Sequence, residues 1–152
     1  MENRKWSFVN AENVEPFVCD ETYSSKQLTG DEMAGFGVIN INEGTLKGGC
    51  RTAGGVHEDA EIYYITEGKG QLWLDEDCLE VKPGDIIVIP PGVFHWIDNR
   101  MNEEAFKLFT LWPKQEQNGV YFERMKAWGT SVKYLDPEYD KKRIVQPEEA
   151  EK

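Results

Sequence analysis

The stretch GDIIVIPPGVFHWIDN, residues 84–99, decides the fold of this chain. Its first part contains the continuous apolar run Ile86–Ile89, which is followed by a turn at Pro90–Gly92. A second apolar run, Phe94–Ile97, follows that turn and contains His95. Short runs of β-forming residues separated by proline–glycine turns are typical of antiparallel sandwiches and barrels, not of alternating strand–helix units.

The same pattern extends in both directions, because glycine pairs and prolines break the chain at short intervals. The strands predicted on this basis cover residues 36–41, 45–56, 62–65, 71–74, 79–81, 86–89, 94–97 and 106–112. We expect turns at 42–44 and 75–77, and a hairpin in which the turn at 67–70 joins 62–65 to 71–74. The predicted fold class is therefore all-β.

Composition limits what the protein can bind. The chain has 152 residues and a net charge of −11, which suits one domain and argues against nucleic acid or anionic membrane as a partner. Its three cysteines, Cys19, Cys50 and Cys78, are a poor disulfide framework and favour a reducing compartment. No apolar run has the length of a signal peptide or a transmembrane helix, so we expect a soluble, cytoplasmic protein.

The two histidines of the chain, His57 and His95, predict where its chemistry lies. Alternation along a strand at 45–56 would put positions 51, 53, 55 and 57 on one face, and Glu61 would open the next strand beside His57. His95 lies on a strand that must pack across the barrel from both. Two imidazoles and one carboxylate form the facial triad that holds a divalent metal and leaves positions open for O2 and substrate. We therefore predict a metal site at His57, Glu61 and His95.

These residues stand at the spacing of a two-part motif, and on it the chain resembles the cupin superfamily. The second half of the motif matches at every fixed position, and the first half matches at all but one. The matching residues are Gly84, Pro90, Gly92, His95 and Asn99 in the second half, and Gly49, His57, Glu61 and Gly68 in the first. The resemblance covers residues 33–112. It implies a double-stranded β-helix, or jelly-roll, barrel with a metal near its axis, and a homodimer.

The chain departs from the cupin motif at one position, where Gly55 replaces the first histidine of a pair. One interpretation is a three-ligand site with one side left open for substrate. The other is a degenerate site that has lost its metal and binds a ligand without catalysis. Asp59, two residues from both His57 and Glu61, is an alternative ligand, although a carboxylate in a turn is usually solvated.

Two further side chains are candidates for a catalytic role. Arg51 would clamp a substrate carboxylate or phosphate if it points into the barrel, and would otherwise form a salt bridge at the barrel mouth. Tyr63 shares the face of Glu61 and is expected to line the cavity near the metal. Asn99 is expected to fix a turn rather than to take part in chemistry.

The resemblance and the ligand set together predict a metalloenzyme that acts on a small organic molecule. The leading reaction is dioxygenase-type oxygenation at Fe(II), although Mn, Ni, Zn and Co also suit imidazole and carboxylate ligands. The alternatives are a metal-dependent isomerase, decarboxylase or lyase of a keto or sugar acid, and a non-catalytic barrel that binds a small ligand. Around the barrel core at 33–112, we expect N-terminal strands or an arm at 1–32, a C-terminal extension at 113–146 and a disordered tail at 147–152.

Overall fold

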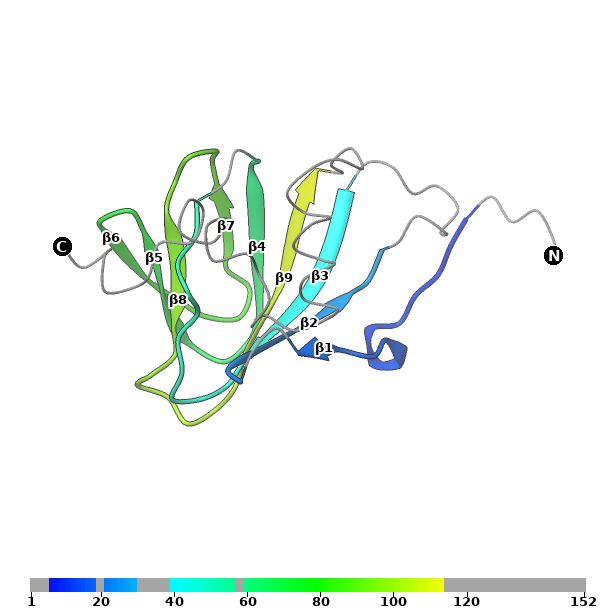
Figure 1. The fold of residues 1–152 in the computed structure, drawn as a ribbon, viewed down its shortest axis with the longest axis horizontal. Helices are drawn as coiled ribbons and strands as arrows, with labels where there is room; N and C mark the ends of the chain where they lie inside the picture. Colours follow the sequence, from blue (N-terminus) through cyan, green and yellow to red (C-terminus); the bar gives the residue numbers. More distant parts are fainter. Residues whose placement is uncertain (1–5, 19–20, 30–38, 57–58, 114–152) are drawn as a thin grey trace.

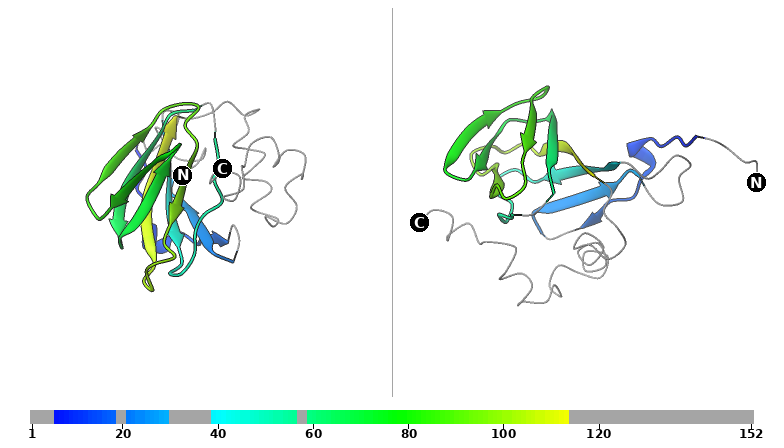
Figure 2. Two further views of the ribbon diagram at one scale, coloured as in Figure 1. Left: turned by 90° about the vertical axis from the view of Figure 1, so that its left-hand side faces the viewer. Right: turned by 90° about the horizontal axis from the view of Figure 1, so that it is seen from above.

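Two antiparallel β-sheets face each other in the computed structural model of this protein, which describes residues 6–18, 21–29, 39–56 and 59–113 (Figures 1 and 2). The larger sheet has the strand order β1-β2-β3-β9-β4-β7, and the smaller sheet has the order β6-β5-β8. A short 3-10 helix, η1 (Ala11–Asn13), precedes them. The strands are β1 (Phe17–Val18), β2 (Tyr23–Gln27), β3 (Ile39–Leu46), β4 (Glu61–Glu67), β5 (Gly70–Leu74), β6 (Asp77–Val81), β7 (Ile86–Ile89), β8 (His95–Asp98) and β9 (Phe106–Pro113). This is the all-β jelly-roll architecture that the sequence predicts.

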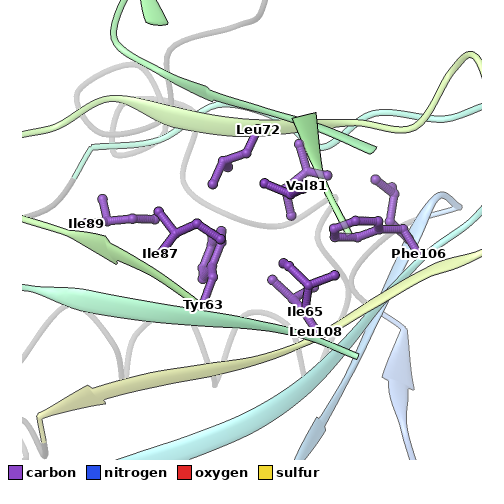
Figure 3. Close-up of a cluster of buried hydrophobic side chains, with 10 residues drawn as sticks. Tyr63, Ile65, Leu72, Val81, Ile87, Ile89, Phe106 and Leu108 are labelled. Atoms are coloured by element: carbon purple, nitrogen blue, oxygen red, sulfur yellow. The ribbon is translucent and has the colours of Figure 1, made fainter. Parts of the chain in front are cut away.

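The hydrophobic core lies between the two sheets. On β3, β4 and β9, buried residues alternate with more exposed ones, as expected when one face of each strand meets the core. The core cluster consists of Leu46, Tyr63, Ile65, Leu72, Val81, Ile87, Ile89, Ile97, Phe106 and Leu108. Figure 3 shows Phe106 at one end of this cluster and Tyr63, Ile87 and Ile89 at the other. Tyr63 and Ile89 also border two of the predicted metal ligands, because Tyr63 contacts His95 and Ile89 pairs with Glu61.

Most predicted strands are present, but the predicted hairpin between residues 62–65 and 71–74 is wrong. The first segment lies in β4 and pairs with β7 and β9, whereas the second lies in β5 and pairs with β6 and β8. The connection between them therefore crosses from one sheet to the other. Gly68 in this connection has a φ of 77°, and a Cβ there would lie 2.6 Å from the carbonyl oxygen of Ala105. Only glycine fits this crossing without strain.

The predicted turn at 42–44 and the predicted strand at 45–56 are also wrong. β3 runs without interruption to Leu46, because residues 42–44 pair in regular register with β9. Tertiary pairing thus overrides the local turn signal. Beyond Leu46 the chain leaves the sheet, and in the described residues up to 56 only Arg51 and Gly55 form bridges, both of them to β8.

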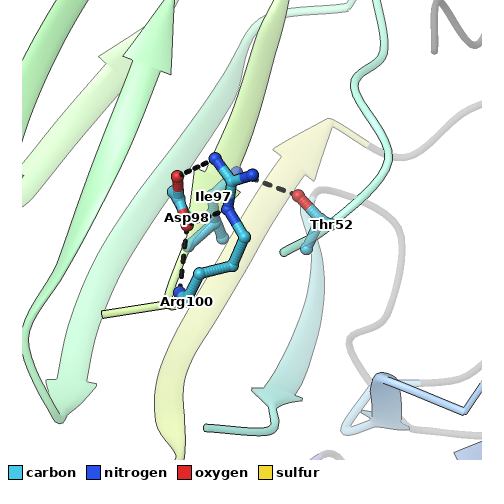
Figure 4. Close-up of polar contacts among 4 residues, drawn as sticks. All are labelled: Thr52, Ile97, Asp98 and Arg100. Carbon is cyan, nitrogen blue, oxygen red and sulfur yellow. Dashed lines mark hydrogen bonds and ion pairs between the residues drawn. The ribbon is translucent and has the colours of Figure 1, made fainter. Parts of the chain in front are cut away.

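The register of these two bridges breaks the alternation that the sequence predicts. Arg51 bridges Asp98 and Gly55 bridges His95, so the first segment is one residue longer than the piece of β8 that it opposes. Such an extra residue reverses the side-chain directions on one side of it. Thr52 forms two hydrogen bonds to β8 beside this extra residue. Its N–H donates to the carbonyl of Ile97 at 2.9 Å. Its hydroxyl oxygen accepts from the N–H of Ile97 at 2.9 Å (Figure 4).

The structure describes part of the predicted N-terminal segment and almost none of the predicted C-terminal extension. β1 and β2 extend the larger sheet beyond β3, and the segment before β1 runs away from the barrel (Figure 1). Of the predicted extension at 113–146, only Pro113 is among the described residues, and the tail at 147–152 lies outside them. Residues 36–38, the start of the predicted strand at 36–41, also lie outside them. The division into core and flanking segments stays a prediction. No helix among the described residues is long and apolar enough to cross a membrane.

Candidate metal centre

Glu61 and His95 meet in the space between the two sheets. Glu61 is the first residue of β4, where it pairs with Ile89 of β7, and His95 is the first residue of β8 in the facing sheet. Oε2 of Glu61 lies 3.2 Å from Nε2 of His95, and the two side chains are only 6% and 7% exposed. The structure thus brings together two of the three predicted ligands.

The contact on the far side of the imidazole determines what faces Glu61. Nδ1 of His95 lies 2.9 Å from the carbonyl oxygen of Val93. A carbonyl can only accept a hydrogen bond, so Nδ1 carries a proton, and in the neutral tautomer that this contact favours the lone pair is on Nε2. That lone pair faces a carboxylate oxygen.

Two acceptors at this distance need a cation to hold them together, either a shared proton or a metal ion. The donor set fits a divalent transition metal, because imidazole nitrogen and carboxylate oxygen are its usual protein ligands. A metal-binding histidine also commonly donates its other ring N–H to a backbone carbonyl, as His95 does to Val93. The residues present therefore fit the metal that the fold implies.

The third predicted ligand, His57, lies outside the described residues, so its place at the site stays a prediction. Gly55, two residues before it, exchanges both backbone hydrogen bonds with His95, at 3.0 and 3.1 Å. Position 55 is therefore held directly beside His95. Asp59 is half-buried. Within the described ranges, no group of three or more His, Cys, Asp or Glu side chains is arranged to hold a metal.

Tyr63 of β4, two residues after Glu61, lies against His95. The two rings meet edge to face, with centroids 5.8 Å apart and planes at 77°. The Tyr63 side chain is buried. This contact limits rotation of the imidazole and covers one side of it, which helps to hold Nε2 toward Glu61.

Arg51 lies on the other face of β8 from His95. Its guanidinium carbon is 5.4 Å from the ring centroid of Trp96, which follows His95 directly in the strand. Consecutive side chains of a strand point to opposite faces, so the structure places Arg51 beside Trp96 rather than beside His95. The sequence predicted that Arg51 and Gly55 share one face, but the extra residue between them reverses the direction of Arg51.

The carboxylate of Asp98, on the same face of β8 as Trp96, binds Arg100. Its Oδ1 accepts hydrogen bonds from the backbone N–H and the Nε of Arg100 at 3.0 and 2.9 Å, and its Oδ2 accepts one from Nη2 at 2.6 Å (Figure 4). The hydrogen bond from the Arg100 side chain lowers the pKa of the Asp98 carboxyl, although burial acts in the opposite direction. Trp73 stacks on Trp96 at 5.4 Å on the same face. These interactions stabilise the smaller sheet and are separate from the metal ligands.

Asn99 fixes the chain after β8, as the sequence predicts. Its side chain is fully buried. The amide Nδ2 donates to the carbonyl oxygens of Lys47 and Glu104 at 3.2 and 2.8 Å, and Oδ1 accepts from Nδ2 of Asn102 at 3.0 Å. Its hydrogen-bonding capacity is thus used to hold three backbone segments together, which is a structural role.

A cluster of buried polar residues on the inner face of the larger sheet was not identified from the sequence. Asn40 and Asn42 of β3 and Thr110 of β9 are at most 5% exposed. A signal was present, because in the run ININ at 39–42 the two asparagines alternate with isoleucines and so share one face. Because a turn was expected at 42–44, Asn42 was not assigned to this strand.

The barrel has the architecture of a cupin, and comparison with known proteins agrees. Residues 42–112 match the family model described as "Cupin domain". Solved structures of the same fold include an RmlC-like cupin from Shewanella frigidimarina NCIMB 400, with a TM-score of 0.62 and 15% identity over 76% of this chain and 98% of that one. The polyketide cyclase RemF from Streptomyces resistomycificus gives a TM-score of 0.65 and 20% identity over 88% of this chain and 95% of that one. The chain belongs to the cupin superfamily.

Curated relatives share shorter stretches with this chain. An uncharacterized protein of Methanocaldococcus jannaschii is 56% identical over 39 residues, which is 26% of this chain and 31% of that protein. An acireductone dioxygenase of Puccinia graminis f. sp. tritici is 36% identical over 70 residues, which is 39% of this chain and 37% of that protein. The chain therefore matches well under half the length of these relatives.

Proposed function

We propose that this cupin is a metal-dependent enzyme that acts on a small organic molecule, with His57, Glu61 and His95 as ligands and a dioxygenase-type reaction at Fe(II). The observation that carries the proposal is the buried pair formed by Nε2 of His95 and Oε2 of Glu61, which face each other at 3.2 Å. The partial similarity to acireductone dioxygenases favours oxygenation over the other metal-dependent reactions. Fe(II), when bound, supplies redox chemistry with O2 that the side chains cannot supply.

The residues of the chain would orient and shield the reacting centre. The Val93 carbonyl keeps the proton on Nδ1 of His95 and so leaves Nε2 available as a ligand. Glu61 contributes a negative charge that partly neutralises a divalent cation. Tyr63 packs edge-on against the imidazole and keeps that side of the site dry, which strengthens electrostatic interactions within it. Gly55 leaves room beside His95 where the cupin motif has a further histidine.

An O2-uptake assay tests the proposed reaction. The full-length protein, loaded with Fe(II) under anaerobic conditions, is mixed with catechols, enediols, thiols and keto acids in air-saturated buffer. We expect uptake only when protein, Fe(II) and a substrate are all present, and we expect His95→Ala to abolish it. Asp59→Ala is the matched control and should keep it.

Two results would contradict the proposal in different ways. Turnover of a substrate at the same rate under strict anaerobiosis would rule out oxygenation and favour an isomerase, decarboxylase or lyase. If no transition metal is retained after loading under reducing conditions, the metal-dependent enzymatic functions are ruled out and a non-catalytic barrel that binds a small ligand is favoured.

A further inference from the structure

A row of buried polar residues crosses the inner face of the larger sheet and ends at the candidate metal centre. Asn42 of β3 pairs with Thr110 of β9, and Thr110 pairs with Tyr63 of β4. Residues that pair directly across antiparallel strands lie on the same face, so all three side chains point into the barrel. Their exposed fractions are 2%, 5% and 8%. Tyr63 in turn contacts His95.

The amide of Asn42 has a hydrogen-bond acceptor that no described residue uses. Its Nδ2 donates to Oγ of Ser25 at 3.1 Å, which orients the amide. Its Oδ1 is buried and has no hydrogen-bond partner within the described part of the chain. A buried acceptor without a partner is destabilising, whereas Leu46, four residues along the same face of β3, packs in the core without such a penalty. Position 42 therefore carries a side chain that is poorly suited to a purely structural role.

The distance from this acceptor to the metal ligands suits one small molecule. Asn42 and Tyr63 lie two strands apart, which is roughly 10 Å in a β-sheet. Glu61 lies two residues before Tyr63 on the same face of β4. A molecule held at Glu61 and His95 would thus extend along the row toward Asn42.

Charge along the row restricts the chemistry of that molecule. Among the described residues of β3, β9 and β4, the buried inner positions hold no lysine or arginine. Two lysines of this sheet lie beside acidic side chains instead, since Nζ of Lys26 is 3.9 Å from Oε1 of Glu43 and Nζ of Lys107 is 3.7 Å from Oε2 of Glu67. A buried carboxylate on the substrate would find no cation to pair with on these strands, and burying it would be costly.

We propose that Asn42, together with Thr110, determines substrate specificity by accepting a hydrogen bond from a neutral, hydroxyl-bearing tail of the substrate. The proposal rests on the proposed function, because the metal centre would hold the other end of the molecule. It names the substrate class as a small molecule with a metal-binding head and an uncharged hydroxylated tail. A molecule whose tail is a carboxylate, as in a dicarboxylic acid, is disfavoured.

Three hydroxamates that share a metal-binding head and differ only in the tail test this. The probes are 6-hydroxyhexanohydroxamic acid, hexanohydroxamic acid and adipic acid monohydroxamate, titrated by calorimetry into the full-length protein loaded with Ni(II). We expect the hydroxyl tail to bind about 5- to 10-fold more tightly than the methyl tail, and the carboxylate tail to bind least tightly. Asn42→Leu should remove the preference for hydroxyl, and Thr110→Val should reduce it. Glu43→Gln, on the outer face of the same strand, should leave it unchanged.

Thermal unfolding of the metal-free protein separates this role from a structural one. Asn42→Leu should leave the Tm unchanged or raise it by about 2–4 °C, because the unpaired acceptor is removed. A large drop in Tm would show that Asn42 is a structural residue and would overturn the proposal. Equal affinity for the hydroxyl and methyl tails in a protein that does bind metal would also overturn it, without affecting the proposed function. Failure to bind Ni(II) or Fe(II) at all would instead overturn the proposed function.

Discussion

At the scale of single residues, the imidazole of His95 is held from three sides. The Val93 carbonyl accepts a hydrogen bond from Nδ1, Tyr63 packs against the ring edge-on, and Glu61 faces Nε2. The first two contacts fix the tautomer and the plane of the ring before any ligand arrives. Preorganisation of this kind is what a metal ligand needs, because little free energy is then spent on ordering it.

A substitution at Gly55 tests the role of the space beside His95. The backbone of Gly55 is hydrogen-bonded to that of His95, so a side chain there starts next to the metal ligand. We predict that Gly55→His raises the affinity for divalent metal, because it adds an imidazole, and lowers O2 uptake, because it fills an open position. Both quantities are measured on the same preparation. Tighter metal binding with full activity would mean that this side of the site is not used by the substrate.

At the scale of strands and turns, local sequence predicted the apolar strands well and their connections poorly. The segments 86–89 and 106–112 were predicted from their β-forming residues, and both lie in strands. The crossing at 67–70 resembles a hairpin turn locally, and only pairing with distant strands shows that it joins two sheets. Likewise, a one-residue irregularity between Arg51 and Gly55 reverses a side-chain direction without leaving a clear mark on composition.

Glycine substitutions test the crossing between the sheets. Gly68 and Gly84 both have positive φ values, of 77° and 94°, but a Cβ at Gly68 would meet the Ala105 carbonyl, whereas Gly84 has open space around it. We predict that Gly68→Ala lowers the free energy of unfolding by about 3 kcal/mol and Gly84→Ala by about 1 kcal/mol, since only the first adds a backbone clash to the left-handed strain. Urea denaturation of both variants measures the difference. Equal losses would show that the crossing tolerates a side chain.

The Asp98–Arg100 pair predicts a pH dependence of stability. The pKa of Asp98 is lowered mainly by its hydrogen bond to the Arg100 side chain, so the folded state favours the carboxylate. The resulting stabilisation is present above the unfolded pKa, near 3.9 for aspartate, and is lost as pH falls through the lower folded value. We predict that Asp98→Asn costs about 1 kcal/mol at pH 7, a modest figure because Arg100 is partly solvent-exposed. The cost should shrink below about pH 4 in chemical denaturation experiments, and a constant cost down to pH 2 would contradict this.

At the scale of the whole molecule, the two predicted ligands contact each other across two sheets that the hydrophobic core holds together. Glu61 belongs to the larger sheet and His95 to the smaller one. The sequence predicted both residues as ligands from motif spacing, and the structure brings them together. It could not predict the polar row behind them, because the direction of Asn42 depends on the register of β3 with β9. The homodimer that the cupin resemblance implies stays a prediction.

Metal binding should stabilise the fold, because an ion held from both sheets binds the native state alone. We predict that adding Fe(II) or Ni(II) at about 100 times its dissociation constant raises stability by about 2.7 kcal/mol. In a differential scanning experiment this corresponds to an increase in Tm of about 5–10 °C. Glu61→Ala, which removes the ligand from the larger sheet, should abolish the increase. An equal increase in that variant would place the ion elsewhere.

The central claim, a metal centre at His57, Glu61 and His95, is tested most directly by elemental analysis of the protein after anaerobic loading with Fe(II) and desalting. We predict about one metal ion per chain in the unaltered protein and in Asp59→Ala, and occupancy reduced about tenfold in His57→Ala, Glu61→Ala and His95→Ala. Circular dichroism on each variant confirms that the barrel is folded. Full metal occupancy in folded Glu61→Ala and His95→Ala would contradict the claim.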